Sequence, residues 1–328
     1  MRLLLVAVAV AFALGLAGAH LTGAHAQPYP TRPITVVVPF PAGGPSDAII
    51  RNLSERMRVS LGQPLVVEYV TGAGGIVGTG RVARANPDGY TIILGHFGTH
   101  ATNGAVYTLS FDLVKDFAPI ALLPENPYLV VARKGLPANN LKEFVAYLKA
   151  NSGTVKMGIP GAGTGPHLVG AQLESMAGAK LQYIPYRGSG PSMVDLIAGQ
   201  IDLMVDQVQT SQAHIRGGTI KAFAIASSKR SEAVPDIPTV DEAGLPGLHM
   251  TLWYGLWAPA NTRPNVIEKL TAAAQDAMAD PAVRQRLHDL GMQIPPREKQ
   301  TPQALHERQT ADIAKWWPII KAANIKPD

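Results

Sequence analysis

Two glycine-rich turns, more than a hundred residues apart, each follow a short apolar segment and open an amphipathic helix. The first, PFPAGGPSD, covers residues 39–47, and the second, PGAGTGPH, covers residues 160–167. Glycine lets the backbone approach a ligand closely, and a helix N-terminus offers unpaired N–H groups and a partial positive charge. The repeated design therefore predicts two loops that close on an anion from opposite sides.

Segments that favour strands alternate with segments that favour helices along the chain. The expected strands are 34–38, 65–70, 90–94, 129–132, 155–159, 181–185, 201–205, 220–226 and 250–258. The expected helices are 48–61, a short helix ending at 85, 141–150, 167–177, 192–198, 209–216, 265–279, 281–290 and 302–323. This alternation predicts an α/β fold with mainly parallel sheets.

Two such series and a returning C-terminal part predict two lobes joined by crossing strands. We expect residues 27–126 with 251–328 to form the first lobe and residues 127–250 the second. Ligands of open α/β sheets bind beyond the carboxyl ends of the strands, where both glycine-rich turns would lie. The site is therefore expected in the cleft between the lobes.

The N-terminus has the parts of an export signal: a basic start at Arg2, an apolar run over 3–19, and small residues before Gln27. An uncleaved membrane anchor is the alternative, but the run is interrupted and falls short of about 20 apolar residues. We expect cleavage after Ala26, so that residues 1–26 are the signal peptide, and a periplasmic location. The chain has no cysteine, so an exported form would depend on core packing without disulfides.

The formal net charge is +5, and the basic residues are scattered along the sequence. A continuous basic track is missing from the sequence, so we expect no nucleic-acid partner. The positive excess suits an anionic small ligand, but solubility would explain it equally well.

In the first turn we expect Ala42, Gly43 and Gly44 to contact the ligand through backbone N–H groups. Asp47 is expected to be structural, since a carboxylate repels an anion, and Phe40 either walls the pocket or packs in the core. In the second turn Gly163 and Gly165 would donate N–H groups and Thr164 its hydroxyl. His167 either contacts the ligand or is a helix-start residue bonded to backbone.

Other candidates follow strands that end at the same edge. Thr99 and His100 are expected to line the cleft; a metal site built on His96 and His100 is the alternative, which the glycines around them disfavour. Arg187 would pair with a second carboxylate of the ligand or with a surface Asp. Gln207 would bond the ligand, and Asp206 would suit a hydroxyl, an amine or a water, or would cap the next helix. The predicted ligand-binding set is Phe40, Ala42, Gly43, Gly44, Thr99, His100, Gly163, Thr164, Gly165, His167, Arg187, Asp206 and Gln207.

Motifs for catalysis and for nucleotides are missing from the sequence. The segment around Gly188-Ser189-Gly190 has Tyr186 where a nucleophile elbow needs glycine, and the glycines at 72–75 lack the spacing of a dinucleotide fingerprint. We therefore expect no enzyme activity, no cofactor and no metal. An exported hydrolase of small acids is an alternative, with Ser, His and Asp assembled from distant parts of the chain.

The order of these segments resembles a known family, the solute-binding receptors of tripartite tricarboxylate transporters, often called Bug proteins or the TctC family. The resemblance covers residues 29–327 and rests on ordered segments that include VPFPAGG at 38–44, GAGG at 72–75, PDGY at 87–90, GTGPHL at 163–168, PYRG at 185–188 and PDIPTVDEAG at 235–244.

That resemblance implies a two-lobed periplasmic-binding-protein fold of the Venus-flytrap type (type II). It also implies a ligand carboxylate held by the two glycine-rich loops, partly through ordered water. The implied function is a periplasmic receptor, expected to be a monomer, that delivers a small organic acid to the membrane subunits of a transporter. The acid would be a di- or tricarboxylate, or an aromatic acid if Phe40 and Trp253 face the cleft. A sensor that reports to a membrane histidine kinase would use the same lobes and stays an alternative.

Overall fold

The computed structural model of the chain describes residues 29–186 and 188–326. The expected signal peptide, residues 1–26, and Arg187 therefore lie outside the described residues. The elements are β1 (Ile34–Val38), α2 (Pro45–Leu61), β2 (Leu65–Tyr69), η1 (Ala73–Gly75), α3 (Ile76–Ala83), β3 (Thr91–His96), η2 (Gly98–Thr102), α4 (Asn103–Val106), β4 (Phe117–Arg133), α5 (Leu141–Ala150), β5 (Lys156–Ile159), α6 (Gly165–Ala177), β6 (Gln182–Pro185), α7 (Ser189–Ile197), β7 (Leu203–Gln207), α8 (Val208–Arg216), β8 (Ile220–Ile225), β9 (Thr251–Pro259), α9 (Pro264–Ala279), α10 (Pro281–Asp289), η3 (Arg297–Lys299) and α11 (Pro302–Ala322).

Several helices begin or end where the sequence carries a capping signal. The side chain of Asn140 accepts the N–H of Glu143 at 2.9 Å at the start of α5. The Glu143 carboxylate in turn accepts the N–H of Asn139 at 2.8 Å, so the first turn of α5 has partners for its free donors. Gly62 and Gly178 end α2 and α6 in the left-handed conformation, which favours glycine.

The nine described strands form one mixed sheet in the order β2-β1-β3-β9-β4-β7-β5-β6, with β8 paired to β4. The pairs β1–β2, β1–β3, β5–β6 and β5–β7 are parallel. Every pair that involves β4 or β9 is antiparallel. The expectation of mainly parallel sheets is therefore wrong, because two long strands enter the sheet in the opposite direction.

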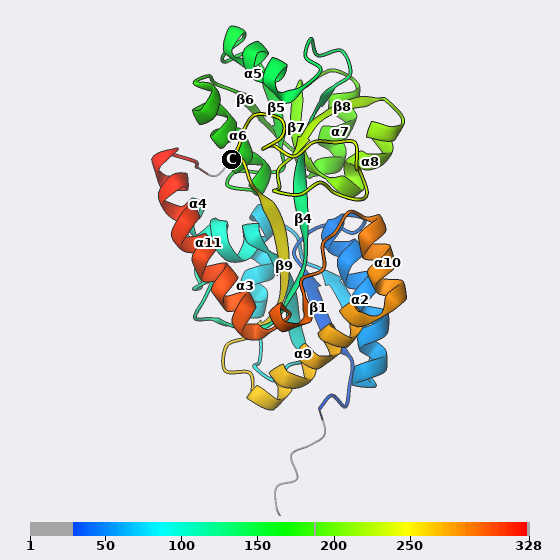
Figure 1. The fold of residues 1–328 in the computed structure, drawn as a ribbon. Coiled ribbons are helices and arrows are strands. Elements are labelled where there is room, and N and C mark those ends of the chain that lie inside the picture. The colour runs from blue at the N-terminus through cyan, green and yellow to red at the C-terminus, as the bar shows by residue number, and fades with distance from the viewer. Residues whose placement is uncertain (1–28, 187, 327–328) are drawn as a thin grey trace, which may run out of the picture. The chain divides into compact units, whose positions relative to one another are not determined.

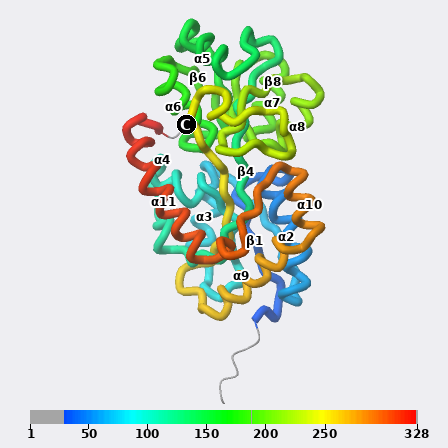
Figure 2. The backbone as a smooth tube through the Cα atoms, in the orientation of Figure 1, coloured from blue at the N-terminus to red at the C-terminus, as the bar shows by residue number. Residues whose placement is uncertain are grey.

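Strand β4 has 17 residues, whereas the sequence predicted only its last part, 129–132. Three prolines obscured the rest, since proline is rare inside strands. Residues 117–127 of β4 pair with β9, and residues 128–133 pair with β7 and β8. We therefore call β1–β3, β9 and the start of β4 the first half-sheet, and β5–β8 with the end of β4 the second. Figures 1 and 2 show the two halves with β4 and β9 running between them.

The change of partner along β4 lies close to the predicted lobe boundary between Asn126 and Pro127, and β9 begins at Thr251, the predicted return to the first lobe. The exact lobe boundaries nevertheless stay a prediction. They matter for the site because the first glycine-rich turn follows β1 and the second follows β5, in different half-sheets.

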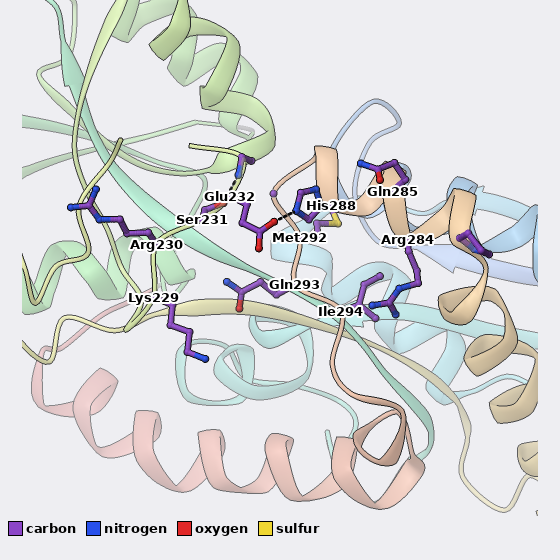
Figure 3. A pocket seen from close by; sticks show the side chains of 13 residues that line it. Lys229, Arg230, Ser231, Glu232, Arg284, Gln285, His288, Met292, Gln293 and Ile294 are labelled. Carbon is purple, nitrogen blue, oxygen red and sulfur yellow. Dashed lines mark hydrogen bonds and ion pairs between the residues drawn. The ribbon is translucent and has the colours of Figure 1, made fainter. Parts of the chain in front are cut away.

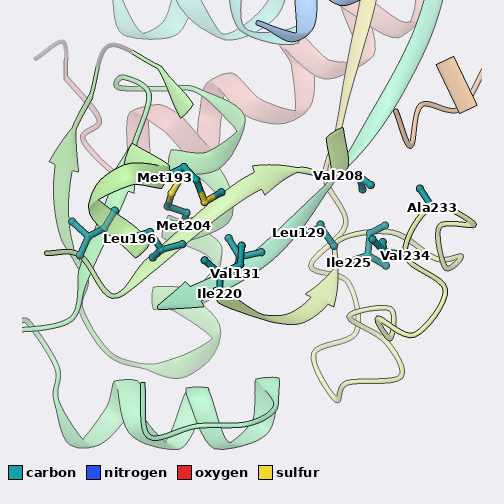
Figure 4. Packing of buried hydrophobic residues seen from close by; sticks show 11 residues of the cluster. Leu129, Val131, Met193, Leu196, Met204, Val208, Ile220, Ile225, Ala233 and Val234 are labelled. Atoms are coloured by element: carbon teal, nitrogen blue, oxygen red, sulfur yellow. The ribbon is translucent and has the colours of Figure 1, made fainter. Parts of the chain in front are cut away.

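Each half-sheet has its own apolar packing. In the first, Trp253, Trp257 and Trp316 are buried with almost no exposed surface. In the second, side chains from β4, α7, β7, α8, β8 and the segments before β7 and after β8 form one buried cluster (Figure 4), with members Leu129, Val131, Met193, Leu196, Ile201, Met204, Val208, Ile220, Ile225, Ala233 and Val234. Within the part of the chain that the structure describes, no helix combines the length and apolar character that a membrane span requires.

Candidate functional site

Both glycine-rich turns hold a glycine in the left-handed region, directly before a helix. Gly43 has φ 83° and Gly163 has φ 70°. Pro45 and Pro166 occupy the first turns of α2 and α6, where a missing N–H costs nothing. The two turns thus have the same backbone design in different half-sheets, as the sequence predicted.

In the first turn Asp47 folds back onto the loop. Its carboxylate accepts the N–H of Gly43 at 2.8 Å and the Nε–H of Arg51 at 2.6 Å, and it also accepts the hydroxyl of Tyr69. Burial raises the pKa of Asp47, but the hydrogen bonds from Tyr69, Gly43 and Arg51 outweigh burial and hold that pKa below its usual value. Asp47 is therefore structural, as expected, and it stabilises the first turn in its ionised form.

The second turn has an equivalent bond. The N–H of Gly163 donates to Nδ1 of His167 at 3.2 Å, and the His167 ring packs against Tyr183 with 4.5 Å between ring centroids. The Thr164 hydroxyl, which was expected to face the ligand, donates to the carbonyl of Gly161 at 2.7 Å. In this structure the side chains of the second turn therefore bond the turn itself.

The second turn packs closely against α4, which follows β3 of the first half-sheet, and against β4. A Cβ added to Gly163 would lie 2.2 Å from Cγ2 of Val106, at the end of α4. A Cβ on Gly165 would lie 2.6 Å from the Tyr128 ring on β4. Only glycine permits these close approaches, so the two halves meet at Gly163 and Val106.

The segment after β3 is a π-helical turn, η2, and not the loop that its glycines predicted. His100 is fully buried, and its ring stacks on Trp257 with 3.8 Å between centroids. Thr99 is 1% exposed, and its hydroxyl contacts Nδ1 of His100 at 2.9 Å. Burial, with a smaller contribution from His96, holds the pKa of His100 well below its usual value. Contact of these two side chains with a ligand stays a prediction.

His96, the last residue of β3, is partly exposed, and the sequence suggested for it only the role of a metal ligand. Its ring stacks on Phe40 at 4.7 Å and meets Tyr254 edge-on at 5.8 Å. The N–H of Gly98 donates to its Nδ1 at 2.9 Å, which places the remaining proton on Nε2. Burial lowers the pKa of His96 to about 4. A neutral His96 with an Nε2–H donor thus lies beside the first turn.

A polar cluster connects the crossing strands to the end of β7. Gln207 Oε1 lies 3.4 Å from both the Tyr254 hydroxyl and Nδ2 of Asn126. Tyr254 also bonds Ser46, in the first turn of α2, and burial raises its pKa. Tyr254 was missed because the sequence suggested its neighbour Trp253 for the cleft. Successive side chains of a strand point to opposite faces, so Trp253 points away from Gln207, and its Nε1–H donates to Asp312 on α11 at 2.5 Å.

Asp206 is 1% exposed at the end of β7. Its Oδ2 accepts the Ser211 hydroxyl at 2.8 Å and also the Thr210 hydroxyl, both from α8. Among the described residues its buried Oδ1 has no hydrogen-bond partner. Asp206 thus bonds hydroxyl groups of α8, and its role toward a ligand stays a prediction, as does that of Arg187 outside the described residues.

A cavity of about 720 Å³ lies away from these turns (Figure 3). Its walls come from the segment after β8 and from α10, and Glu232 meets His288 across it at 2.7 Å. None of the predicted ligand-binding residues lines this cavity. Within residues 29–186 and 188–326, no group of three or more His, Asp or Glu side chains has the arrangement of a metal site.

Comparisons with known proteins agree with this architecture. Residues 49–325 match the family described as "Tripartite tricarboxylate transporter family receptor". The structure of the periplasmic binding protein BugD is 40% identical and superposes with a TM-score of 0.84, covering 91% of this chain and 100% of that chain. MatC from Rhodopseudomonas palustris with bound malate is 39% identical with a TM-score of 0.82, covering 89% of this chain and 100% of that chain. A protein of Agrobacterium vitis, encoded in a ttuE-ttuC' intergenic region, is 38% identical over 296 residues, which are 90% of this chain and 85% of that protein.

Proposed function

The chain belongs to the tripartite tricarboxylate transporter receptor family of periplasmic solute-binding proteins, and we propose that it captures a small organic dicarboxylate between its two glycine-rich turns. In this proposal the receptor is exported, binds its ligand without chemical change and presents it to the membrane subunits of a transporter. The observation that carries the proposal is the repeated turn, with a left-handed glycine before a helix N-terminus in each half-sheet.

The free donors of the turns suit a carboxylate. Among the described residues, the N–H groups of Gly44 and Ser46 in the first turn have no hydrogen-bond partner, and the same holds for Thr164 and Gly165 in the second. The first four N–H groups of a helix lack partners inside the helix, and they lie at its positive end. One carboxylate between the two helix starts would accept bonds from both half-sheets, directly or through water.

The rest of the proposed site is polar but mostly uncharged. His96 is neutral above pH 5 because its pKa is about 4, and Tyr254 and Gln207 add neutral groups beside it. A second carboxylate then needs a cation elsewhere, and we assign that role to Arg187. The malate bound to MatC, a relative of similar length, supports a dicarboxylate.

A thermal-shift screen over mono-, di- and tricarboxylates and aromatic acids tests this function. A ligand that binds only the folded state adds RT ln(1 + [L]/Kd) to its stability, which is about 2.7 kcal/mol at 100 times Kd. We expect dicarboxylates to raise Tm and matched monocarboxylates to have little effect. Stabilisation by none of these acids would refute the proposal.

Calorimetry on Arg187→Ala tests the assignment of the second carboxylate. The loss should be about 1.5–3 kcal/mol for a diacid, the range of a charge-assisted bond, and much smaller for the matched monoacid. Equal losses for both acids would give Arg187 a structural or general electrostatic role.

A further inference from the structure

The two turns share one more feature, a side chain four residues after each left-handed glycine. Asp47 accepts the N–H of Gly43 at 2.8 Å, and His167 accepts the N–H of Gly163 at 3.2 Å. Both side chains lie in the first turn of the following helix, so each bond closes its glycine-rich turn onto that helix. We call Asp47 and His167 the turn acceptors.

The turn acceptors bond the N–H groups of Gly43 and Gly163, which the glycine-rich motif alone would assign to a ligand. With the N–H of Gly43 and of Gly163 already bonded, a ligand would reach the later N–H groups, at Gly44 and Ser46 and at Thr164 and Gly165. A glycine in the left-handed region has no preference of its own for that conformation, because it populates both signs of φ about equally. A side chain that bonds its N–H therefore selects one conformation before a ligand arrives.

We propose that Asp47 and His167 are positioning residues that hold the two turns in the anion-binding conformation, and that His167 acts through Gly163 without touching the ligand. The expected effect on ligand affinity rests on the proposed function, whereas the bond between His167 and Gly163 is present without a ligand. This positioning role replaces the expectation that His167 contacts the ligand.

The chemistry of the two acceptors differs, and this difference makes the proposal testable. A carboxylate accepts a hydrogen bond through the whole neutral range, whereas Nδ1 of histidine accepts only while it carries no proton. Among the described residues, Tyr183 on β6 packs against the His167 ring, and Glu174 on α6 lies next to Tyr183. Burial raises the pKa of Tyr183, so it stays neutral, and Glu174 lies 3.6 Å from Lys180 and accepts the N–H of Leu181 at 2.6 Å.

The two roles considered for His167, positioning of Gly163 and contact with the ligand, predict opposite pH dependence of the ligand affinity. If His167 positions Gly163, its protonation breaks the bond and ligand affinity falls as the solution is acidified. If His167 touches the ligand carboxylate, its protonation adds an attractive charge and affinity rises on acidification. The test is made from about pH 6 to 8, a range that lies around the ordinary histidine pKa of about 6.5 and in which carboxylates remain ionised.

The first experiment needs no ligand. In glycine-labelled protein, the Gly163 amide is followed by NMR in the natural protein, His167→Asn, His167→Ala and the exposed control His306→Asn. Asn offers an oxygen at the reach that Asp47 shows in the first turn, so it should keep the bond at every pH. We expect a Gly163 amide titration in the natural protein and in His306→Asn and none in His167→Asn. In His167→Ala we expect amide exchange about fivefold faster, as for loss of one hydrogen bond. A Gly163 amide that behaves alike in all four proteins would overturn the proposal whatever the ligand.

The second experiment measures the affinity for malate, or for the acid that gives the largest thermal shift, at several pH values. We expect His167→Ala to bind about five- to tenfold more weakly, His167→Asn to bind nearly normally without pH dependence, and Asp47→Ala to lose more than Asp47→Asn. Tighter binding of the natural protein at low pH that disappears in His167→Asn would make His167 a ligand contact and overturn the positioning role. If no acid binds, the proposed function fails, while the NMR result still decides the proposal about the turn.

Discussion

Replacing Gly163 by alanine tests whether the contact between the two halves belongs to the ligand-bound state. The new Cβ would lie 2.2 Å from Cγ2 of Val106, while carbon atoms in contact prefer about 3.5–4.0 Å. The second turn and α4 must therefore separate by more than ~1 Å, or Val106 must repack. Overpacking of this kind costs about 1–3 kcal/mol.

Gly163→Ala also carries a backbone cost, because φ at this position is 70°. A matched control separates the two effects. Gly178 has φ 61° at the end of α6, and a Cβ there would meet nothing within 4 Å. Gly178→Ala should thus show the cost of a left-handed alanine alone, about 1–2 kcal/mol in the free energy of unfolding.

We expect Gly163→Ala to weaken ligand binding by about 1–3 kcal/mol, or roughly 5- to 150-fold, while Gly178→Ala binds normally. Val106→Ala removes the colliding methyl groups and leaves the Val106 Cβ at 3.4 Å from the new atom, so the double variant should recover most of the loss. Calorimetry and small-angle scattering with and without ligand measure both effects. If Gly163→Ala binds and compacts like the natural protein, Gly163 and Val106 do not meet in the bound state.

Three further predictions concern the same site. Gly43→Val should abolish binding of organic acids without unfolding the protein, because a β-branched residue does not adopt φ 83°, although the space around the Cβ is open. If calorimetry shows normal binding, the first turn is not part of the site. Tyr254→Phe removes a buried hydroxyl beside Ser46 and Gln207, and urea unfolding should show a loss of about 1–2 kcal/mol, whereas an unchanged midpoint would mean that the cluster adds no stability. The pKa of His96 is about 4 in the folded protein and about 6.5 in the unfolded chain, so the unfolded chain binds the proton first as the pH falls. His96 therefore costs no stability above pH 6.5, and it lowers the free energy of unfolding as the pH falls from 6.5 toward 4. Urea unfolding of His96→Asn should accordingly lose less stability between pH 7 and 5 than the natural protein, by on the order of 1–2 kcal/mol, and parallel losses would contradict this.

The alternation of strands and helices was enough to predict most elements, because each depends on local signals. The capping pair Asn140 and Glu143 and the terminal glycine of α2 have the predicted local roles. Strand β4 could not be predicted in full, since it contains three prolines, two of which, Pro119 and Pro124, lie at register shifts against β9. Those shifts are long-range features, and a single sequence contains no direct signal for them.

The backbone of the candidate site was predictable, but the partners of its side chains were not. The glycine-rich turns follow from composition and position, so Gly43 and Gly163 were found. The burial of His100 against Trp257 depends on a residue more than 150 positions away in the chain. Similarly, Tyr254 reaches the site only because β9 pairs with β3 and β4, and strand alternation decides that it, and not Trp253, faces Gln207.

The shared strands β4 and β9 have a consequence for cooperativity. Strand β4 is a continuous part of both half-sheets, because it pairs with β9 at one end and with β7 and β8 at the other. The described residues from 32 to 326 correspondingly belong to one compact unit. Cutting the chain between residues 126 and 127 would divide β4, so neither half would keep this strand whole, and we expect neither to be stable as an isolated fragment. The receptor should therefore melt in a single calorimetric transition, with its two halves able to bend against each other but unable to unfold one at a time.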